Sequence, residues 1–158
     1  MIGSTEAMAL PRTWHLFGED HLPYQILLLA KIIDRESARH LQSQHGRSLA
    51  EWRVLAFICG IGPSSASEIG TAAEIDRAEI SRAVTKLSAA GLIERNPADG
   101  NRRRLVIRPT PAGKAEYRKI RGERRAYFQA IMSGVPAKQR PEFGRHLEAI
   151  AERVDSVR

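Results

Sequence analysis

Basic side chains are the residues of this chain whose number and spacing suit a definite chemistry, the binding of phosphate groups. The 158-residue sequence has 25 Lys and Arg against 18 Asp and Glu, a formal net charge of +7. Residues 76–108 contain eight cations and four anions, and residues 114–125 contain six cations and two anions. A basic cluster indicates a nucleic-acid partner only where the fold can present it to phosphates, so its meaning depends on the elements that carry it.

Residue types that support catalysis or metal binding show no comparable pattern. The five histidines lack metal-ligand spacing, and the sequence has neither a glycine-rich phosphate loop nor a nucleophile elbow. We therefore expect no enzyme, no cofactor and no bound metal. The single cysteine, Cys59, excludes a disulfide framework and most thiolate zinc sites. A redox role for Cys59 is an alternative, but its place on an apolar helix face favours an inert thiol.

The apolar segments are too short for a membrane protein. The longest strongly apolar run, Ile26 to Ile33, contains Lys31 and is far shorter than the ~20 residues that a membrane span needs. The N-terminus has no cationic segment followed by an apolar stretch, so no signal peptide is evident. A cytoplasmic protein without membrane association is expected.

Apolar residues at helical spacing predict two helices before residue 63. The first runs from Leu22 to about Gly46, with Ile26, Leu29 and Ile33 on one face. The second follows Ser48 and Glu51, which have the S-x-x-E form of a capping box, and ends within residues 60–63. The preceding residues 1–20 form an N-terminal arm without a sustained period.

Two further capping pairs predict a helix-turn-helix. Ser65 with Glu68 starts a short third helix, and Asp76 with Glu79 starts a fourth that ends at Gly91. Only residues 74–76 separate the two helices. So tight a connection between two short helices is typical of the helix-turn-helix.

The sequence after Gly91 predicts a β-hairpin and two final helices. Residues 92–95 and 105–107 are β-prone, and the turn-rich segment 96–101 lies between them. Thr110 and Pro111 are a good N-cap and first helical residue for a fifth helix that ends near Ser133. A sixth helix includes residues 147–154. The expected fold is mainly α with a small β-hairpin, a winged helix-turn-helix.

The flanking helices are expected to form a homodimer. We divide the chain into the arm 1–20, which packs partly in the dimer, dimerisation helices 21–46 and 114–158, and a DNA-binding domain 48–113. The expected dimer contacts are apolar residues at the two ends of the chain: Leu16, Phe17, Leu22, Ile131, Met132, Val135, Leu147, Ile150 and Val154. Dimeric readers of the major groove place two recognition helices about one turn, ~34 Å, apart, so the expected partner is a palindromic duplex-DNA operator.

The fourth predicted helix carries the residues best placed to read DNA. Residues 78, 81, 82 and 85 lie three or four positions apart and so share one face. Such a helix fits the major groove, where Arg donates two hydrogen bonds to guanine and Ser bonds several base edges. The expected contacts are Arg77, Ala78, Ser81, Arg82 and Lys86 on this helix and Arg102, Arg103 and Arg104 on the wing. Lys86 contacts a phosphate in this interpretation, or else is a solvated surface charge.

Two alternatives concern the basic residues. A winged helix can also act as a protein-interaction adaptor, but an adaptor needs no cationic wing, so the arginines favour DNA. The second basic segment, residues 114–125, either extends the DNA footprint or forms a solvated face.

Several consecutive motifs resemble the MarR family of bacterial transcription regulators. The matching segments are Ala66–Gly70, Ile80–Leu87, Ala90–Arg95, Asn101–Arg103 and Thr110–Gly113. Their order and spacing span residues 48–113 without a break. Two departures stand out: Asn101 replaces the family's wing Asp, with Asp99 two residues earlier, and Pro109-Thr110 replaces Leu-Thr. Asp99 or Asn101 would therefore brace the wing.

The resemblance implies a repressor that a small molecule releases from DNA, often an aromatic carboxylate or a phenol bound between the dimer helices and the winged domain. It also implies that Arg103 enters the minor groove. The residues expected to line the effector cleft are Trp14, His15, His21, Tyr24, Trp52 and Arg53. Arg and His can hold a carboxylate, although each of these residues also suits an ordinary packing or surface role.

Overall fold

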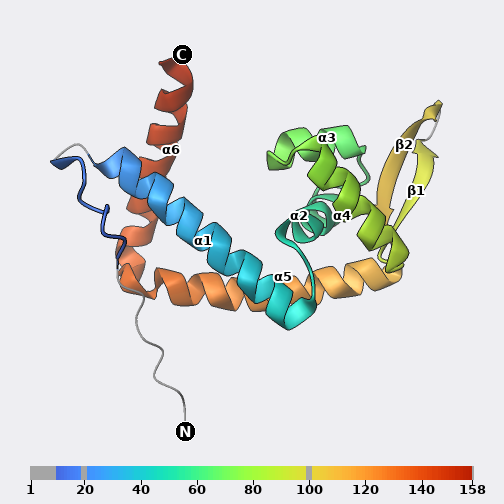
Figure 1. The fold of residues 1–158 in the computed structure, drawn as a ribbon, viewed down its shortest axis with the longest axis horizontal. Helices are drawn as coiled ribbons and strands as arrows, with labels where there is room; N and C mark the ends of the chain where they lie inside the picture. The colour runs from blue at the N-terminus through green and yellow to red at the C-terminus, as the bar shows by residue number, and fades with distance from the viewer. Residues whose placement is uncertain (1–9, 19–20, 99–100, 158) are drawn as a thin grey trace, which may run out of the picture.

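The computed structural model describes residues 10–18, 21–98 and 101–157, and it confirms the mainly α winged helix-turn-helix. The elements are α1 (Leu22–His45), α2 (Leu49–Gly60), α3 (Ala66–Ala73), α4 (Arg77–Ala89), β1 (Ile93–Ala98), β2 (Asn101–Pro109), α5 (Pro111–Ile131) and α6 (Arg140–Ser156). Short 3-10 turns at Met132–Gly134 and Ala137–Gln139 join α5 to α6. Figure 1 shows α2, α3, α4 and the hairpin at one end of α5, and α6 at its other end.

Side-chain caps begin the helices where the sequence predicts them. The Ser65 hydroxyl accepts the Glu68 amide while the Glu68 carboxylate accepts the Ser65 amide, a complete capping box. Asp76 accepts the amide of Glu79 at 2.8 Å to start α4. Ser48 accepts the amide of Glu51 at 3.1 Å.

The turn between α3 and α4 has a backbone conformation that the sequence does not announce. Glu74 has φ 51°, the left-handed region, at the C-cap of α3. The Ile75 amide then donates to the Gly70 carbonyl at 3.0 Å, and the Ile75 side chain is buried. This Schellman-type cap provides donors for carbonyl groups at the end of α3 and turns the chain sharply into α4.

The wing strands are longer than predicted. The predicted turn 96–101 is wrong at its ends, because residues 96–98 pair in β1 and residue 101 pairs in β2. Pro97 lies opposite Leu105, which is tolerated because both strands of a two-stranded sheet are edges. Ser64 and Ile107 exchange backbone hydrogen bonds of 2.8 and 3.3 Å, so the segment before α3 anchors β2.

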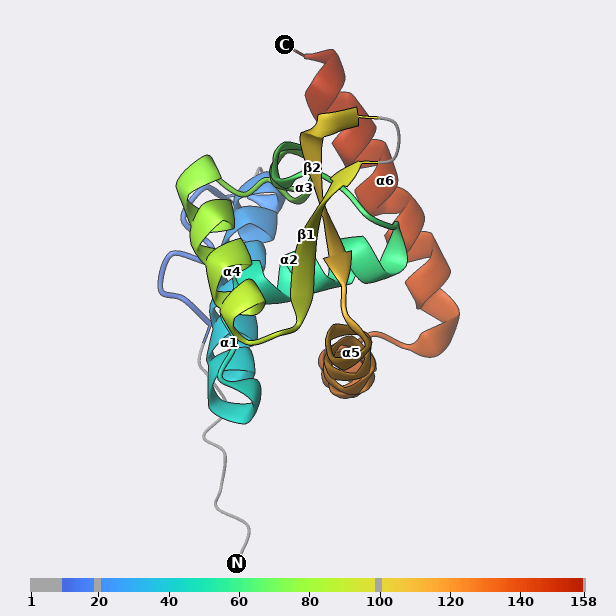
Figure 2. The ribbon, with the colours of Figure 1, turned by 90° about the vertical axis from the view of Figure 1, so that its right-hand side faces the viewer.

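The winged domain has its own apolar core. Residues of α2, α3, α4 and the hairpin form one buried cluster, centred on Leu55, Ile69 and Leu87 at 0% exposure. Figure 2 shows α5 end-on beneath the hairpin, with α4 on the side of the domain away from α6. Leu41 of α1 and Ile120 of α5 are also fully buried.

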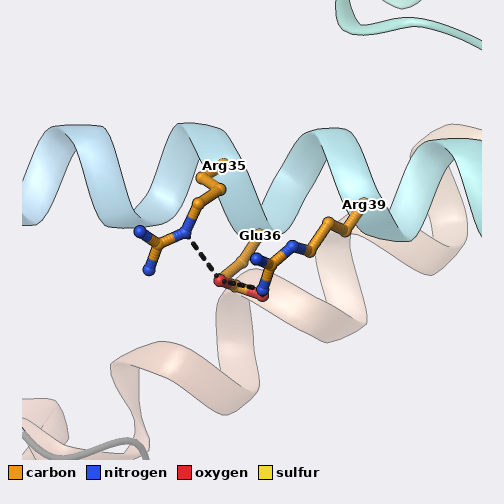
Figure 3. Close-up of polar contacts among 3 residues, drawn as sticks. All are labelled: Arg35, Glu36 and Arg39. Carbon is orange, nitrogen blue, oxygen red and sulfur yellow. Dashed lines mark hydrogen bonds and ion pairs between the residues drawn. The ribbon is translucent and has the colours of Figure 1, made fainter.

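Helix α1 carries a local ion cluster formed by Arg35, Glu36 and Arg39 (Figure 3). Glu36 accepts hydrogen bonds from Arg35 at 3.1 Å and from Arg39 at 3.0 Å. The hydrogen bond from Arg35, with the charge of Arg39, holds the pKa of the Glu36 carboxyl below its usual value. Because exposed ion pairs contribute little to stability, we attribute the position of α1 to the burial of residues such as Leu41.

The backbone at the start of α5 passes so close to Leu92 that only glycine fits at position 113. A Cβ on Gly113 would overlap the carbonyl oxygen of Leu92, which accepts the Thr110 amide at 3.0 Å. We expect Gly113→Ala to lower the free energy of unfolding by about 1–3 kcal/mol or more, measured by denaturant titration.

The matched control lies on the same helix. Gly122 of α5 has no atom within 4 Å of an added Cβ, so Gly122→Ala should raise stability by roughly 1 kcal/mol. Equal stability of Gly113→Ala and wild type would contradict the close packing of α5 on Leu92.

Candidate nucleic-acid interface

Helix α4 separates an inner apolar face from an outer polar one. Ile80, Ala83, Val84 and Leu87 are buried in the core. The predicted DNA contacts on this helix are all exposed: Arg77, Ala78, Ser81, Arg82 and Lys86. The Thr85 hydroxyl donates to the Ser81 carbonyl at 2.9 Å, so this bond lies along the outer face. The structure thus places the predicted α4 residues on one accessible side.

A groove of about 650 Å³ lies between α3, α4 and the wing, and we call it the wing groove. Its polar or exposed lining residues are Ala66, Ser67 and Thr71 of α3, Arg77 and Ser81 of α4, Arg95 of β1 and Leu105 of β2. Sequence reasoning did not single out the groove residues of α3, or Arg95 and Leu105 of the hairpin. Ser67 and Thr71 are four positions apart and exposed, but only the packing of α3 on α4 brings them beside Ser81.

Lys86 has a partner within the chain. Its Nζ lies 3.8 Å from Oε1 of Glu51 on α2, while 69% of the Lys86 side chain stays exposed. The same Glu51 carboxylate lies 3.6 Å from Arg47. Lys86 is therefore not a purely solvated charge. The Glu51 carboxylate competes with a DNA phosphate for its ammonium group.

The predicted wing residues are only partly described. The backbones of Asn101, Arg102, Arg103 and Arg104 belong to β2. Their side chains, and the whole of Asp99, lie outside the described residues. The roles of these arginines and the bracing by Asp99 or Asn101 remain predictions.

A second concavity, of about 620 Å³, combines arginines with aromatic rings, and we call it the arginine cavity. It is lined by Trp52 of α2, by Arg121, Arg124, Arg125, Phe128 and Gln129 of α5, and by Met132 and Arg140. The Arg124 guanidinium lies 5.4 Å from the Trp52 ring centre and 4.9 Å from that of Phe128. Such stacking suits the planar guanidinium.

Arg124 is the most constrained cation of this cavity. It is 8% exposed, and its Nη1 has no hydrogen-bond partner among the described residues. Burial lowers the pKa of Arg124, opposed by Tyr127 and Asp34, yet an arginine stays charged in proteins. A buried cation with an unused donor suits an anion.

Of the six predicted effector residues, Trp52 alone lines the arginine cavity. Arg53 instead donates to Asp34 at 2.8 Å. The others cluster near the start of α1: the His15 and His21 rings are 5.5 Å apart, Tyr24 meets Phe17, and the Trp14 carbonyl accepts from Gln25. The structure therefore does not bring the predicted set together.

Cys59 is a half-buried free thiol on α2. Burial raises the pKa of the Cys59 thiol, against the smaller opposing effect of Lys114 and Arg118. These cations of α5 are neighbours that the sequence did not reveal. Burial thus outweighs these cations, and a raised pKa keeps the thiol protonated and slow to react, which disfavours a redox role.

Two searches of the described ranges were negative. None of their helices is long and apolar enough to cross a bilayer. No three His, Cys, Asp or Glu side chains there come close enough to hold a metal ion.

Comparison with known proteins agrees with this geometry. The MarR family model matches residues 45–104. The HTH-type transcriptional repressor IacR of Pseudomonas putida is 27% identical over 143 residues, which cover 89% of this chain and 84% of the relative.

Solved structures share the fold as well. A MarR/EmrR family regulator from Acinetobacter sp. ADP1 superposes with a TM-score of 0.75 at 22% identity, over 86% of this chain and 96% of that one. A MarR family protein of Mycobacterium tuberculosis in complex with salicylic acid gives 0.68 at 24% identity, over 82% and 95%. Residues 45–104 thus match the family model of the MarR transcriptional regulators, and the chain as a whole has the winged helix-turn-helix fold of solved members of that family.

Proposed function

We propose that this chain is a homodimeric repressor that binds a palindromic operator and is released by a small aromatic acid. The observation that carries the proposal is the exposed polar face of α4 beside the wing groove, with Arg77, Ser81 and Arg82 outward. The relative IacR is described as a repressor, which supports that direction of control.

In the proposed complex, α4 lies in the major groove. Arg77, Ser81 and Arg82 reach base edges or phosphates, because Arg pairs with guanine through two hydrogen bonds. Ala78, which is uncharged, packs against the DNA in the major groove. Arg103 of the wing enters the minor groove, where the negative potential attracts a guanidinium, and Arg102 and Arg104 contact phosphates or support the wing.

Exposed apolar side chains support a dimer. Along α6, Leu147, Ile150 and Val154 are 40%, 42% and 63% exposed at helical spacing, and α6 contributes no described residue to the buried core. At the other end of the chain, Leu16, Phe17 and Leu22 are 56–66% exposed. Exposed apolar faces of this kind favour association, so we propose them as the dimer contacts.

The arginine cavity is the proposed effector site. Arg124 offers an unused donor to a carboxylate, and Trp52 and Phe128 offer apolar rings for an aromatic body. Few polar groups within an apolar lining are typical of small-molecule sites. The relative of known structure with bound salicylic acid shows that a protein of this fold accepts such a ligand.

The DNA interface predicts a loss of affinity in two variants. Arg82→Ala should weaken binding roughly 5- to 150-fold, the cost of about 1–3 kcal/mol for a lost base contact. Arg103→Ala should weaken binding several-fold and make the slope of log affinity against log salt shallower by about 0.9 for each protomer. Fluorescence anisotropy with the DNA upstream of the chain's own gene measures both.

The matched control for both variants is Arg145→Ala, which removes one exposed arginine of α6. Its affinity and salt slope should equal those of wild type. A salt slope unchanged by Arg103→Ala would contradict the minor-groove assignment, and an affinity unchanged by Arg82→Ala would contradict the role of α4.

The dimer is tested by a charge on its proposed face. Ile150→Asp should yield a folded monomer at micromolar concentration in sedimentation velocity, because Ile150 is already 42% exposed in one chain. Ile61→Asp, at a 74% exposed residue beyond α2, is the control and should stay dimeric. A wild type that sediments as a monomer would rule out this part of the proposal.

Salicylate tests the effector site. At tenfold excess over its Kd it should raise the melting temperature by about 3–6 °C, the effect of about 1.4 kcal/mol on a chain of this size. Arg124→Met should lose that shift relative to its own unliganded melting temperature, whereas Arg118→Met, outside the cavity lining, should keep it. An equal shift with neutral salicylamide would argue against recognition of the carboxylate.

A further inference from the structure

A chain of four charges joins the recognition helix to α2 and α5. Glu51 Oε1 lies 3.8 Å from Lys86 of α4, and Glu51 Oε2 lies 3.6 Å from Arg47. Arg47 in turn lies 3.6 Å from Glu116 of α5. The Glu51 side chain is only 4% exposed, so it is the buried member of this chain.

The position of Glu51 follows from how α2 begins. Its amide donates to the Ser48 hydroxyl, which fixes the backbone. In the capping box of α3 the Glu68 carboxylate folds back onto Ser65, whereas the Glu51 carboxylate extends toward Arg47 and Lys86. A buried carboxylate needs cations nearby, because burial without them is costly.

Lys86 therefore has two possible partners for one ammonium group. It lies one turn beyond Arg82 on α4, with most of its side chain exposed. Because 69% of the Lys86 side chain is exposed, its ammonium group can pair either with Glu51 or with a phosphate. The charge of Glu51 decides how far Lys86 is available to a phosphate.

We propose that Glu51 is a positioning residue that holds Lys86 back from the DNA and thereby limits operator affinity. This inference rests on the proposed DNA-binding function. It refines the predicted role of Lys86, which in the wild type stays with Glu51 and makes little contribution to phosphate neutralisation. Because Glu51 is on α2 and its partner Arg47 reaches α5, the restraint on Lys86 depends on how these helices pack.

The test is a salt titration of binding to the labelled upstream duplex by the full chain. Glu51→Gln keeps the shape of the side chain and removes its charge. It should steepen the slope of log affinity against log salt by about 0.9 for each protomer, and tighten binding about fivefold per protomer at 0.15 M salt. Lys86→Gln should change the wild-type slope by less than half that amount, but should cancel the whole gain in the Glu51→Gln background.

Glu116→Gln is the matched control, because it removes a carboxylate of the same charge chain that contacts Arg47 and not Lys86. Its slope should equal that of wild type. A wild-type slope in Glu51→Gln, or a steeper slope that persists without Lys86, would overturn the inference. If Glu51→Gln does not fold, Lys86→Gln alone still tests the inference. A salt slope that is shallower by the full amount of about 0.9 for each protomer in Lys86→Gln would overturn the inference. Failure of wild type to bind any duplex would instead contradict the proposed function.

Discussion

The burial of α2 is the interaction on which the rest of the winged domain depends. Val54, Leu55 and Ile58 are at most 2% exposed and pack with residues of α3, α4 and the hairpin. The same helix also contacts α1 and α5. Truncating one such side chain costs about 2–5 kcal/mol, a large share of the ~5–15 kcal/mol by which a domain is stable. This apolar burial therefore orients α4 and shapes the wing groove. The ion pairs around the core add to an arrangement of helices that the apolar packing already determines.

The positive charge of the chain divides between two surfaces of different character. Cations of residues 76–108 include Arg77 and Arg95, which line the wing groove. In residues 114–125, three of the six cations line the arginine cavity instead. The carboxylates of that segment lie beside partners on other elements, Glu116 near Arg47 and Glu123 2.9 Å from the buried His45. The second basic segment thus differs from both a simple solvated face and a plain extension of the first.

The features that the sequence predicted correctly are those controlled by interactions between residues close together in the chain. The starts of α3 and α4 follow from Ser65 and Asp76, because a hydroxyl or carboxylate accepts an amide only three residues away. It did not predict the left-handed Glu74, since Glu shows no intrinsic preference for positive φ. Nor did it predict that β1 continues through Pro97. The composition of residues 96–101 is typical of a turn, and the pairing of Pro97 with Leu105 becomes evident only when the partner strand is in place. The Ser64–Ile107 bridge was missed for the same reason.

By itself, the sequence determined the order of the elements, the inner and outer faces of α4 and the resemblance to a family. These depend on caps and apolar spacing, which act over three or four residues. Only the tertiary structure decided which distant residues share a surface: Trp52 with Arg124, Arg53 with Asp34 and Glu51 with Lys86. Such pairings depend on how packed helices cross and on which side chains the packing leaves exposed. Local sequence rules carry no information about either.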